Sequence, residues 1–324
     1  MLIILMAKEK TMGVNNSVFP SKPEKKYFDH LTEKWGLKCK IYSNLPFLTV
    51  FNIDDLCDLS KQPPNKKMKL SKRDIERLKK TSIDYTMCDF DDKPMICIEF
   101  DGIQQGMNVG SKYVTKKESN NWRKTIMNLK LKIAHSSLFP FFVMQSNHFE
   151  VINKDDKLAI VDCVIGSILS NKEMTERFEN GFDPQEFGMN DDEFYSLNKI
   201  ERDAFLEYWA TGIDVECSLK HNPIHEITYQ LKEKLGVKKL GYGPIEPPEL
   251  KNISNVLERA KIIDEIYTLG YRAWIELPDG RRFDSKIWVP DFRTADCTPY
   301  AYIDDLAVYL ALKKLKKILF EKRE

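Results

Sequence analysis

One short segment constrains the fold of this chain more than any other. Residues 95–102 read Met-Ile-Cys-Ile-Glu-Phe-Asp-Gly, an apolar β-strand that ends in two acidic residues. Because strand side chains alternate between the two faces of a sheet, Glu99 and Asp101 point to the same face. Two carboxylates at the end of a buried strand are costly unless positive charge pairs with them, and a hydrated divalent cation is a common partner. The segment therefore predicts a sheet with an acidic site at one end.

A second predicted strand, over residues 83–88, brings another carboxylate toward this pair. Apolar side chains alternate with Asp84 along it. The polar segment 89–93 predicts a turn, so the strand over residues 94–101 returns antiparallel to the first. In such a hairpin the start of the first strand faces the end of the second. Asp84 is therefore expected near Glu99 and Asp101.

An amphipathic helix is predicted before this hairpin. One or two strands, over residues 37–53, follow that helix. Ser21 suits the N-cap of the helix, and Gly36 ends it. Apolar residues follow Glu24 at helical spacing, which places this carboxylate on the buried side. Two interpretations of Glu24 stay open: a capping-box partner of Ser21, or a member of the acidic site.

The helix predicted over residues 121–135 carries positive charge toward the acidic residues. Its apolar residues, beginning with Trp122, form two stripes, and Arg123 and Lys130 lie between them. A cation in a buried helix face needs an anionic partner, and the acidic strand ends can provide it. Lys132 projects to the polar side, so Lys130 is the preferred partner. A buried strand follows this helix.

A basic segment over residues 61–80 lies before the hairpin, and its second part is predicted as a short helix. Beside a carboxylate site, such a segment suits a phosphate backbone. A solvated basic loop explains its composition equally well. The residues of this segment expected to contact nucleic acid are Lys72, Arg73 and Arg77.

The order of these elements resembles the PD-(D/E)XK nuclease superfamily, which has the restriction-endonuclease-like fold. The resemblance covers residues 1–145 and is closest to a bacterial branch in which the lysine has moved to the following helix. The motifs that carry it are Pro23-Glu24, Ser82-Ile83-Asp84-Tyr85, Cys97-Ile98-Glu99-Phe100-Asp101-Gly102 and Lys130.

The resemblance implies a role for each residue of this set. Asp84 and Glu99 would bind Mg²⁺ or Mn²⁺, and Glu24 would hold a second metal or its water shell. Asp101 occupies the position where the standard motif has lysine. Lys130 would replace that lysine, orienting the attacking water and offsetting charge in the transition state. Arg123 would contact a phosphate in such a site.

Composition sets few further limits. The 324 residues carry 50 Lys+Arg and 49 Asp+Glu, so net charge does not indicate a partner. The 7 cysteines include no Cys-x-x-Cys pair, which favours free thiols in a reducing cytosol. No segment is long and apolar enough to cross a membrane. A cytoplasmic protein without a membrane partner is expected.

Four divisions of the chain are predicted. They are an N-terminal extension (1–19), the nuclease-like domain (20–150), a mostly helical region (151–240) and a small α+β domain (241–324). The Gly- and Pro-rich segment 241–248 is interpreted as a linker. The last division is expected to run helix (255–269), hairpin (271–277 and 283–289) and helix (302–320). A strand is predicted over 213–217, and His221 with His225 is disfavoured as a metal pair because no third ligand is near.

The sequence as a whole predicts an α/β protein with a mixed central sheet flanked by helices. The expected activity is Mg²⁺- or Mn²⁺-dependent hydrolysis of phosphodiester bonds in DNA, with RNA as the less favoured substrate. The alternative is an inactive module of the same fold that binds nucleic acid or protein, in which the acids and Lys130 form a buried ion-pair network. A homodimer, and a protein partner bound through the C-terminal region, are both compatible with these patterns.

Overall fold

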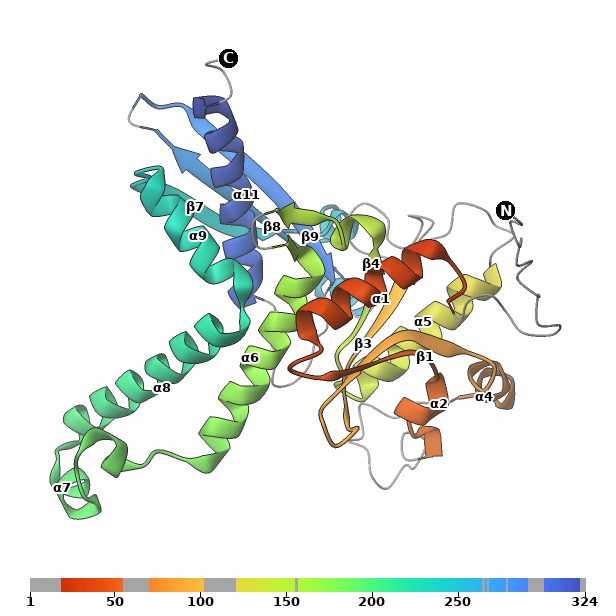
Figure 1. The fold of residues 1–324 in the computed structure, drawn as a ribbon, viewed down its shortest axis with the longest axis horizontal. Coiled ribbons are helices and arrows are strands. Elements are labelled where there is room, and N and C mark those ends of the chain that lie inside the picture. Colours follow the sequence, from red (N-terminus) through yellow and green to blue (C-terminus); the bar gives the residue numbers. More distant parts are fainter. Residues whose placement is uncertain are drawn as a thin grey trace, which may run out of the picture.

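A computed structural model of the chain (Figure 1) shows a mixed α/β architecture. It describes residues 19–54, 70–101, 121–154, 157–263, 266, 268–277, 279–290 and 300–320. The predicted N-terminal extension therefore lies almost wholly outside the described residues, as does the first part of the basic segment. Within the described part of the chain, no helix is long and apolar enough to span a membrane.

The first sheet contains the two acidic strands. Its strands, in spatial order, are β1 (Lys40–Pro46), β2 (Ser82–Cys88), β3 (Pro94–Asp101) and β4 (Phe141–Gln145). The pairs β1–β2 and β2–β3 are antiparallel, whereas β3–β4 is parallel. The sheet is therefore mixed, as predicted, and the hairpin of β2 and β3 is confirmed. Pro46 ends the edge strand, where a missing backbone N–H is tolerated.

Helices cover both faces of this sheet. The helices are α1 (Lys22–Trp35), α2 (Phe47–Val50), α4 (Lys72–Leu78) and α5 (Asn121–Ser136). Leu31 of α1 shares a buried cluster with Ile98 of β3, and Leu131 of α5 shares another with Cys97. Because Cys97 and Ile98 are consecutive in a strand, they point to opposite faces. The sheet is thus a middle layer between α1 and α5 (Figure 1).

Of the one or two strands predicted over residues 37–53, one forms as β1, and α2 occupies the place of the second. Phe47 and Phe51 are both buried, and their rings stack with centroids 4.6 Å apart. A spacing of four residues puts two side chains on one face of a helical turn, whereas in a strand it would leave them too far apart to stack. The packing of these two rings explains why this short apolar run is helical.

Long helices dominate the middle of the chain. After η2 (Ser146–His148) and the short pair β5 (Val151–Asn153) and β6 (Leu158–Ala159), α6 (Ile160–Asn180) leads to η3 (Pro184–Phe187), α7 (Asp191–Ser196), α8 (Lys199–His221) and α9 (Pro223–Lys234). The outer parts of α6 and α8 project from the body as an arm, with α7 at its tip (Figure 1). The strand predicted over 213–217 is wrong. Ile213 and Cys217 are buried on one face of α8, so the run follows helical spacing.

A close contact fixes α6 against the junction of α8 and α9. A Cβ added at Gly166 would lie 2.3 Å from the backbone oxygen of His221 and 2.9 Å from Pro223 Cδ. We therefore expect Gly166→Ala to lower the free energy of unfolding by about 1–3 kcal/mol. The matched control is Gly212→Ala in α8, where a Cβ meets nothing within 4 Å. That change should raise stability by about 0.5–1 kcal/mol. Urea unfolding compares the two, and equal effects would contradict this packing.

The C-terminal part contains a three-stranded antiparallel sheet. It is formed by β7 (Lys239–Ile245), β8 (Thr268–Glu276) and β9 (Arg282–Pro290), with η4 (Pro248–Leu250) and α10 (Val256–Ile263) between the first two and α11 (Tyr300–Phe320) after the last. The predicted hairpin and final helix are confirmed. The linker predicted over 241–248 is wrong, because most of it is β7. Pro244 is tolerated in this edge strand, and the helix predicted over 255–269 ends earlier because β8 begins at Thr268.

One buried cluster connects the two larger sheets. It includes Ile98 of β3, Val164 of α6, Ile275 of β8 and Leu306 of α11. The first sheet, α6 and the C-terminal sheet therefore share apolar contacts. The division into separate domains at residues 150 and 240 stays a prediction.

Candidate active site

The hairpin of β2 and β3 places Asp84 beside Glu99. Tyr85 pairs with Ile98, so one further step of this register sets Asp84 opposite Glu99. Directly opposed residues of antiparallel strands share a face, with Cβ atoms about 4.5–5.5 Å apart. The backbone N–H of Phe100 donates to Asp84 Oδ2 at 2.7 Å. The two carboxylates therefore lie side by side on the sheet face that α5 covers.

Lys130 of α5 reaches this pair from the covering helix. Its Nζ donates to Glu99 Oε1 at 2.6 Å and to the backbone oxygen of Ser82 at 2.6 Å. Lys130 is 4% exposed and Glu99 is 6% exposed, so their ion pair is buried. The aromatic ring of Phe47 lies 6.0 Å from the same Nζ. The helical spacing of α5 predicted this buried lysine, whereas Ser82 and Phe47 had no signal in the sequence.

The arginine beside the end of β3 is less enclosed than Lys130. Asp101 is 1% exposed, and Arg123 Nη2 lies 3.6 Å from its Oδ1. The Arg123 side chain is itself 37% exposed, and Trp122 is 58% exposed. The prediction that Trp122 belongs to a buried stripe is therefore wrong, and Arg123 lies at the rim of the site. A helical pattern does not show how far the sheet extends beneath a helix.

Glu24 approaches the acidic pair from α1, on the other side of the sheet. The Ser21 hydroxyl donates to Glu24 Oε1 at 2.9 Å, and the Glu24 N–H donates to Ser21 Oγ at 3.3 Å. The Tyr85 hydroxyl donates to the Glu24 backbone oxygen at 2.8 Å. The charge of Glu24 also contributes to raising the pKa values of Asp84 and Glu99. Glu24 thus interacts with its N-cap and lies close enough to affect the acidic pair.

Burial and mutual repulsion change the acidity of the pair. Burial, followed by the charge of Glu99, raises the pKa of Asp84 to about 8, although the Phe100 N–H and Lys130 act in the opposite direction. Burial also raises the pKa of Glu99, and Lys130 opposes this shift. Such perturbed carboxylates are characteristic of sites that use their charge. A further cation at this position would relieve the repulsion between them.

The donor chemistry of these residues fits Mg²⁺ or Mn²⁺. Asp84 and Glu99 supply carboxylate oxygens, which hard divalent cations prefer, and Glu24 can supply a third. As the side chains stand in the described residues, no group of three or more His, Cys, Asp or Glu is placed to hold a metal ion. Glu99 instead directs one oxygen to Lys130. The nearest fit is therefore the pair Asp84 and Glu99, with rearrangement of Glu24.

Divalent ion binding should depend on pH in a direction set by Asp84. Its pKa is about 8, so the carboxyl is largely protonated at about pH 6 and ionised at about pH 9. The proton and the ion compete for the same oxygens. We expect Mg²⁺ to raise the melting temperature more at the higher pH, measured by scanning fluorimetry against EDTA. An equal rise at both pH values would show that Asp84 is not a ligand.

The basic residues expected at nucleic acid lie on α4, which packs close to α5. Lys72 and Arg73 are exposed. Arg77 Nη1 lies 3.6 Å from Asp74 Oδ1, and Asp74 forms a capping box with Ser71. Part of the charge on α4 therefore stabilises its own helix. Lys72 and Arg73 remain available to a ligand, and Arg77 shares its charge with Asp74.

The two histidines with metal-like spacing have separate partners. His221 Nε2 lies 2.7 Å from Glu173 Oε2, and His225 Nδ1 lies 2.8 Å from Asp305 Oδ2. The helix is interrupted between α8 and α9, and this directs the two histidines to different helices, α6 and α11. Each histidine therefore has a carboxylate partner of its own on a different helix.

Sequence analysis missed one buried carboxylate, Asp162. It is 0% exposed and accepts from Trp35 Nε1 at 2.9 Å, from the Ala159 N–H at 2.8 Å and contacts His30 Nε2 at 3.1 Å. Its place in the first turn of α6 is the signal that could have indicated a capping role. Because these contacts join α1 to α6, Asp162 holds the helix that carries Glu24.

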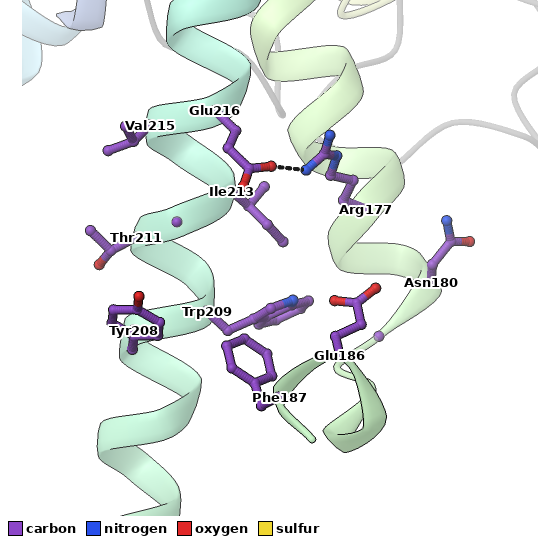
Figure 2. Close-up of a pocket in the computed structure, with 12 residues that line it drawn as sticks. Arg177, Asn180, Glu186, Phe187, Tyr208, Trp209, Thr211, Ile213, Val215 and Glu216 are labelled. Carbon is purple, nitrogen blue, oxygen red and sulfur yellow. Dashed lines mark hydrogen bonds and ion pairs between the residues drawn. The ribbon is translucent and has the colours of Figure 1, made fainter. Parts of the chain in front are cut away.

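A cavity of about 660 Å³ lies on the projecting arm, away from the carboxylates. Figure 2 shows it between the end of α6 and α8, with Trp209 and Phe187 among its lining residues. Arg177 donates to Glu216 at 2.7 Å across its upper part. The charged residues that line the cavity include Arg177 and Glu216, which pair with each other. None of the residues predicted for the acidic site lines the cavity. We therefore do not assign the chemistry to this cavity.

Comparisons of the chain with protein-family models, with curated proteins and with solved structures find no match. The interpretation of the acidic site therefore rests on its residues and geometry.

Proposed function

We propose that this chain is a Mg²⁺- or Mn²⁺-dependent nuclease that hydrolyses phosphodiester bonds in DNA, with a restriction-endonuclease-like core. One observation carries the proposal. A buried lysine, Lys130, is held on Glu99 at 2.6 Å, and Asp84 lies beside that pair on the neighbouring strand. Two carboxylates and a lysine at one end of a mixed sheet are the groups that metal-assisted phosphoryl chemistry requires.

Each residue has a role in this proposal. Asp84 and Glu99 would hold the ion, and Glu24 would complete its shell or hold a second one. Bound there, the ion supplies Lewis-acid polarisation of the phosphodiester and a more acidic water. Lys130 would orient the attacking water and offset negative charge at the phosphate. Asp101 keeps Arg123 at the rim, where its partly exposed guanidinium can bind a phosphate oxygen.

The proposal is tested with purified full-length protein and a panel of substrates. Supercoiled DNA, linear duplex, single-stranded DNA and RNA are incubated with Mg²⁺, Mn²⁺ or EDTA. We expect DNA nicking or degradation that needs the ion, and its loss in Asp84→Ala and in Glu99→Ala. Cleavage that survives both substitutions would exclude this site as its source, and ion-dependent cleavage of RNA alone would change the substrate.

A second function, a non-catalytic module that binds nucleic acid or protein, is favoured by one contact pattern. Lys130 has two acceptors already, Glu99 and the Ser82 backbone oxygen, so the buried pair is satisfied without a metal. This alternative predicts no heat of Mn²⁺ binding by calorimetry. It also predicts nucleic-acid binding that is unchanged by Asp84→Ala and by Mn²⁺.

A further inference from the structure

The C-terminal sheet has one face that α11 does not cover. In its register, Gly243 pairs with Arg272 and Arg272 pairs with Lys286. Directly opposed residues of antiparallel strands share a face. Trp274, Arg282 and Trp288 lie at even spacing from these residues, so they share that face as well. We name it the open face, defined by Gly243, Arg272, Trp274, Arg282, Lys286 and Trp288.

The alternate residues of the same strands lie against α11. Ala273 and Ile275 are each 1% exposed and share a buried cluster with Leu306. Ser285 donates through its hydroxyl to the backbone oxygen of Ala307 at 2.6 Å. Figure 1 shows α11 lying along the sheet. On the open face, by contrast, a Cβ added at Gly243 would meet nothing within 4 Å, so the surface there is uncovered.

The open face carries more positive than negative charge. Lys239 pairs with Glu276 at 2.5 Å, and Arg282 Nε donates to Asp284 at 3.0 Å. Within each of these two ion pairs the positive and negative charges cancel. Arg272 and Lys286 form no ion pair with another described residue, and both are exposed neighbours on β8 and β9. The face therefore presents two adjacent cations that form no ion pair within the described part of the chain.

One tryptophan ring, that of Trp274, holds two arginines of this face in place. The Cζ atoms of Arg282 and Arg272 lie 4.7 Å and 5.5 Å from the centroid of the Trp274 ring. That ring covers Gly241, where an added Cβ would lie 2.2 Å from Trp274 Cζ2. At Gly241 the absence of a side chain therefore makes room for this ring. Guanidinium groups stacked in this way lose less freedom when they bind a ligand.

We propose that the open face binds duplex DNA. A twisted antiparallel sheet with projecting arginines can enter the major groove of B-form DNA, where guanidinium forks contact phosphates and guanine edges. The major groove of A-form RNA is too narrow for side chains to read, which favours DNA. An acidic protein segment would also match the charge, and it becomes the favoured occupant if the protein does not bind duplex DNA. If the chain is the proposed nuclease, the open face holds its DNA substrate, and this role rests on the proposed function. DNA binding by the open face does not itself require the acidic site.

Binding is measured by fluorescence anisotropy with a labelled mixed-sequence duplex and full-length protein in EDTA. Gly243→Glu puts a carboxylate on the open face at a position where an added Cβ meets nothing within 4 Å, and we expect it to weaken binding at least about tenfold. The matched control is Gly212→Glu on the projecting arm, where an added Cβ also meets nothing within 4 Å. The control should bind like the unchanged protein. Circular dichroism melts confirm that both variants are folded.

A salt titration gives a second readout. Lys286→Gln should reduce the slope of log Kd against log salt by about 1 if the lysine contacts a phosphate. Three results would overturn the inference: no duplex binding by the unchanged protein, equal binding by Gly243→Glu, or tenfold tighter binding of an RNA duplex of the same sequence.

The outcome is separable from that of the proposed nuclease, because binding is measured in EDTA, where the proposed ion is absent. Loss of binding in Gly243→Glu without any ion-dependent cleavage would support the open face and reject the nuclease. Ion-dependent cleavage with unchanged binding in Gly243→Glu would do the reverse.

Discussion

Asp84→Asn should abolish metal-dependent cleavage and at the same time stabilise the protein above about pH 8. The amide keeps an oxygen for the Phe100 N–H, which donates to Asp84 Oδ2 at 2.7 Å. It removes the negative charge that an ion requires, so we expect activity to fall about a thousandfold. Most substitutions at catalytic carboxylates leave open whether the fold was lost. Here the predicted gain in stability excludes that explanation.

The sign of the stability change follows from the pKa. Folding raises the pKa of Asp84 from its ordinary 3.8 to about 8. The folded state therefore holds a proton that the unfolded state has released, and stability falls as pH rises between these values. Removing the carboxylate removes this loss, so Asp84→Asn should gain about 1–3 kcal/mol at about pH 9 and little at about pH 4.

Urea unfolding at several pH values and plasmid cleavage with Mn²⁺ measure the two effects together. Asp29→Asn is the control, because Asp29 is exposed and, among the described residues, forms its ion pair with Lys25, four residues earlier. It should keep full activity and nearly unchanged stability. An Asp84→Asn protein that is less stable at high pH would mean that the carboxylate is compensated in a way this structure does not show.

Lys130→Met should destabilise the fold by about 3–5 kcal/mol, because it leaves Glu99 buried without its partner. The Ser82 backbone oxygen would lose its donor as well. Changing both members, in Lys130→Met with Glu99→Leu, should recover much of this loss, since paired apolar replacements of a buried ion pair are often neutral. Neither variant should cleave DNA.

A double-mutant cycle by urea unfolding measures the coupling between the two residues. The exposed pair Lys157 and Glu33, with side chains 69% and 67% exposed, is the control. Its Lys157→Met variant should lose less than about 1 kcal/mol. Additive effects of Lys130→Met and Glu99→Leu would contradict a buried, coupled pair.

The sequence predicted the acidic hairpin well because its signals are local. Alternation along β2 and β3, with a polar turn between them, determines that Asp84 faces Glu99 whatever the rest of the chain does. The spacing of apolar residues in α5 likewise marks Lys130 as buried. These patterns report which side of an element a residue is on. They do not report its atomic partners, so the Ser82 oxygen and the Phe100 N–H were not predictable.

The errors concern features that depend on distant residues. Segment 241–248 has the composition of a linker, but Gly241 is small because the ring of Trp274 covers it from the next strand. Residues 213–217 alternate like a strand, yet Ile213 and Cys217 are buried together against other elements. Trp122 fits the apolar stripe of α5, but it is exposed. In each case tertiary packing decides the outcome.

The measurement that tests the proposed metal site most directly is a crystal structure of the protein soaked in Mn²⁺, with anomalous data. We predict one peak between the carboxylates of Asp84 and Glu99, at the usual ligand distances of about 2.0–2.6 Å. Glu99 would then share its oxygens between the ion and Lys130. A fully soaked crystal that shows no peak at Asp84, and in which Glu99 still pairs with Lys130, would contradict the metal-dependent nuclease and favour the non-catalytic module.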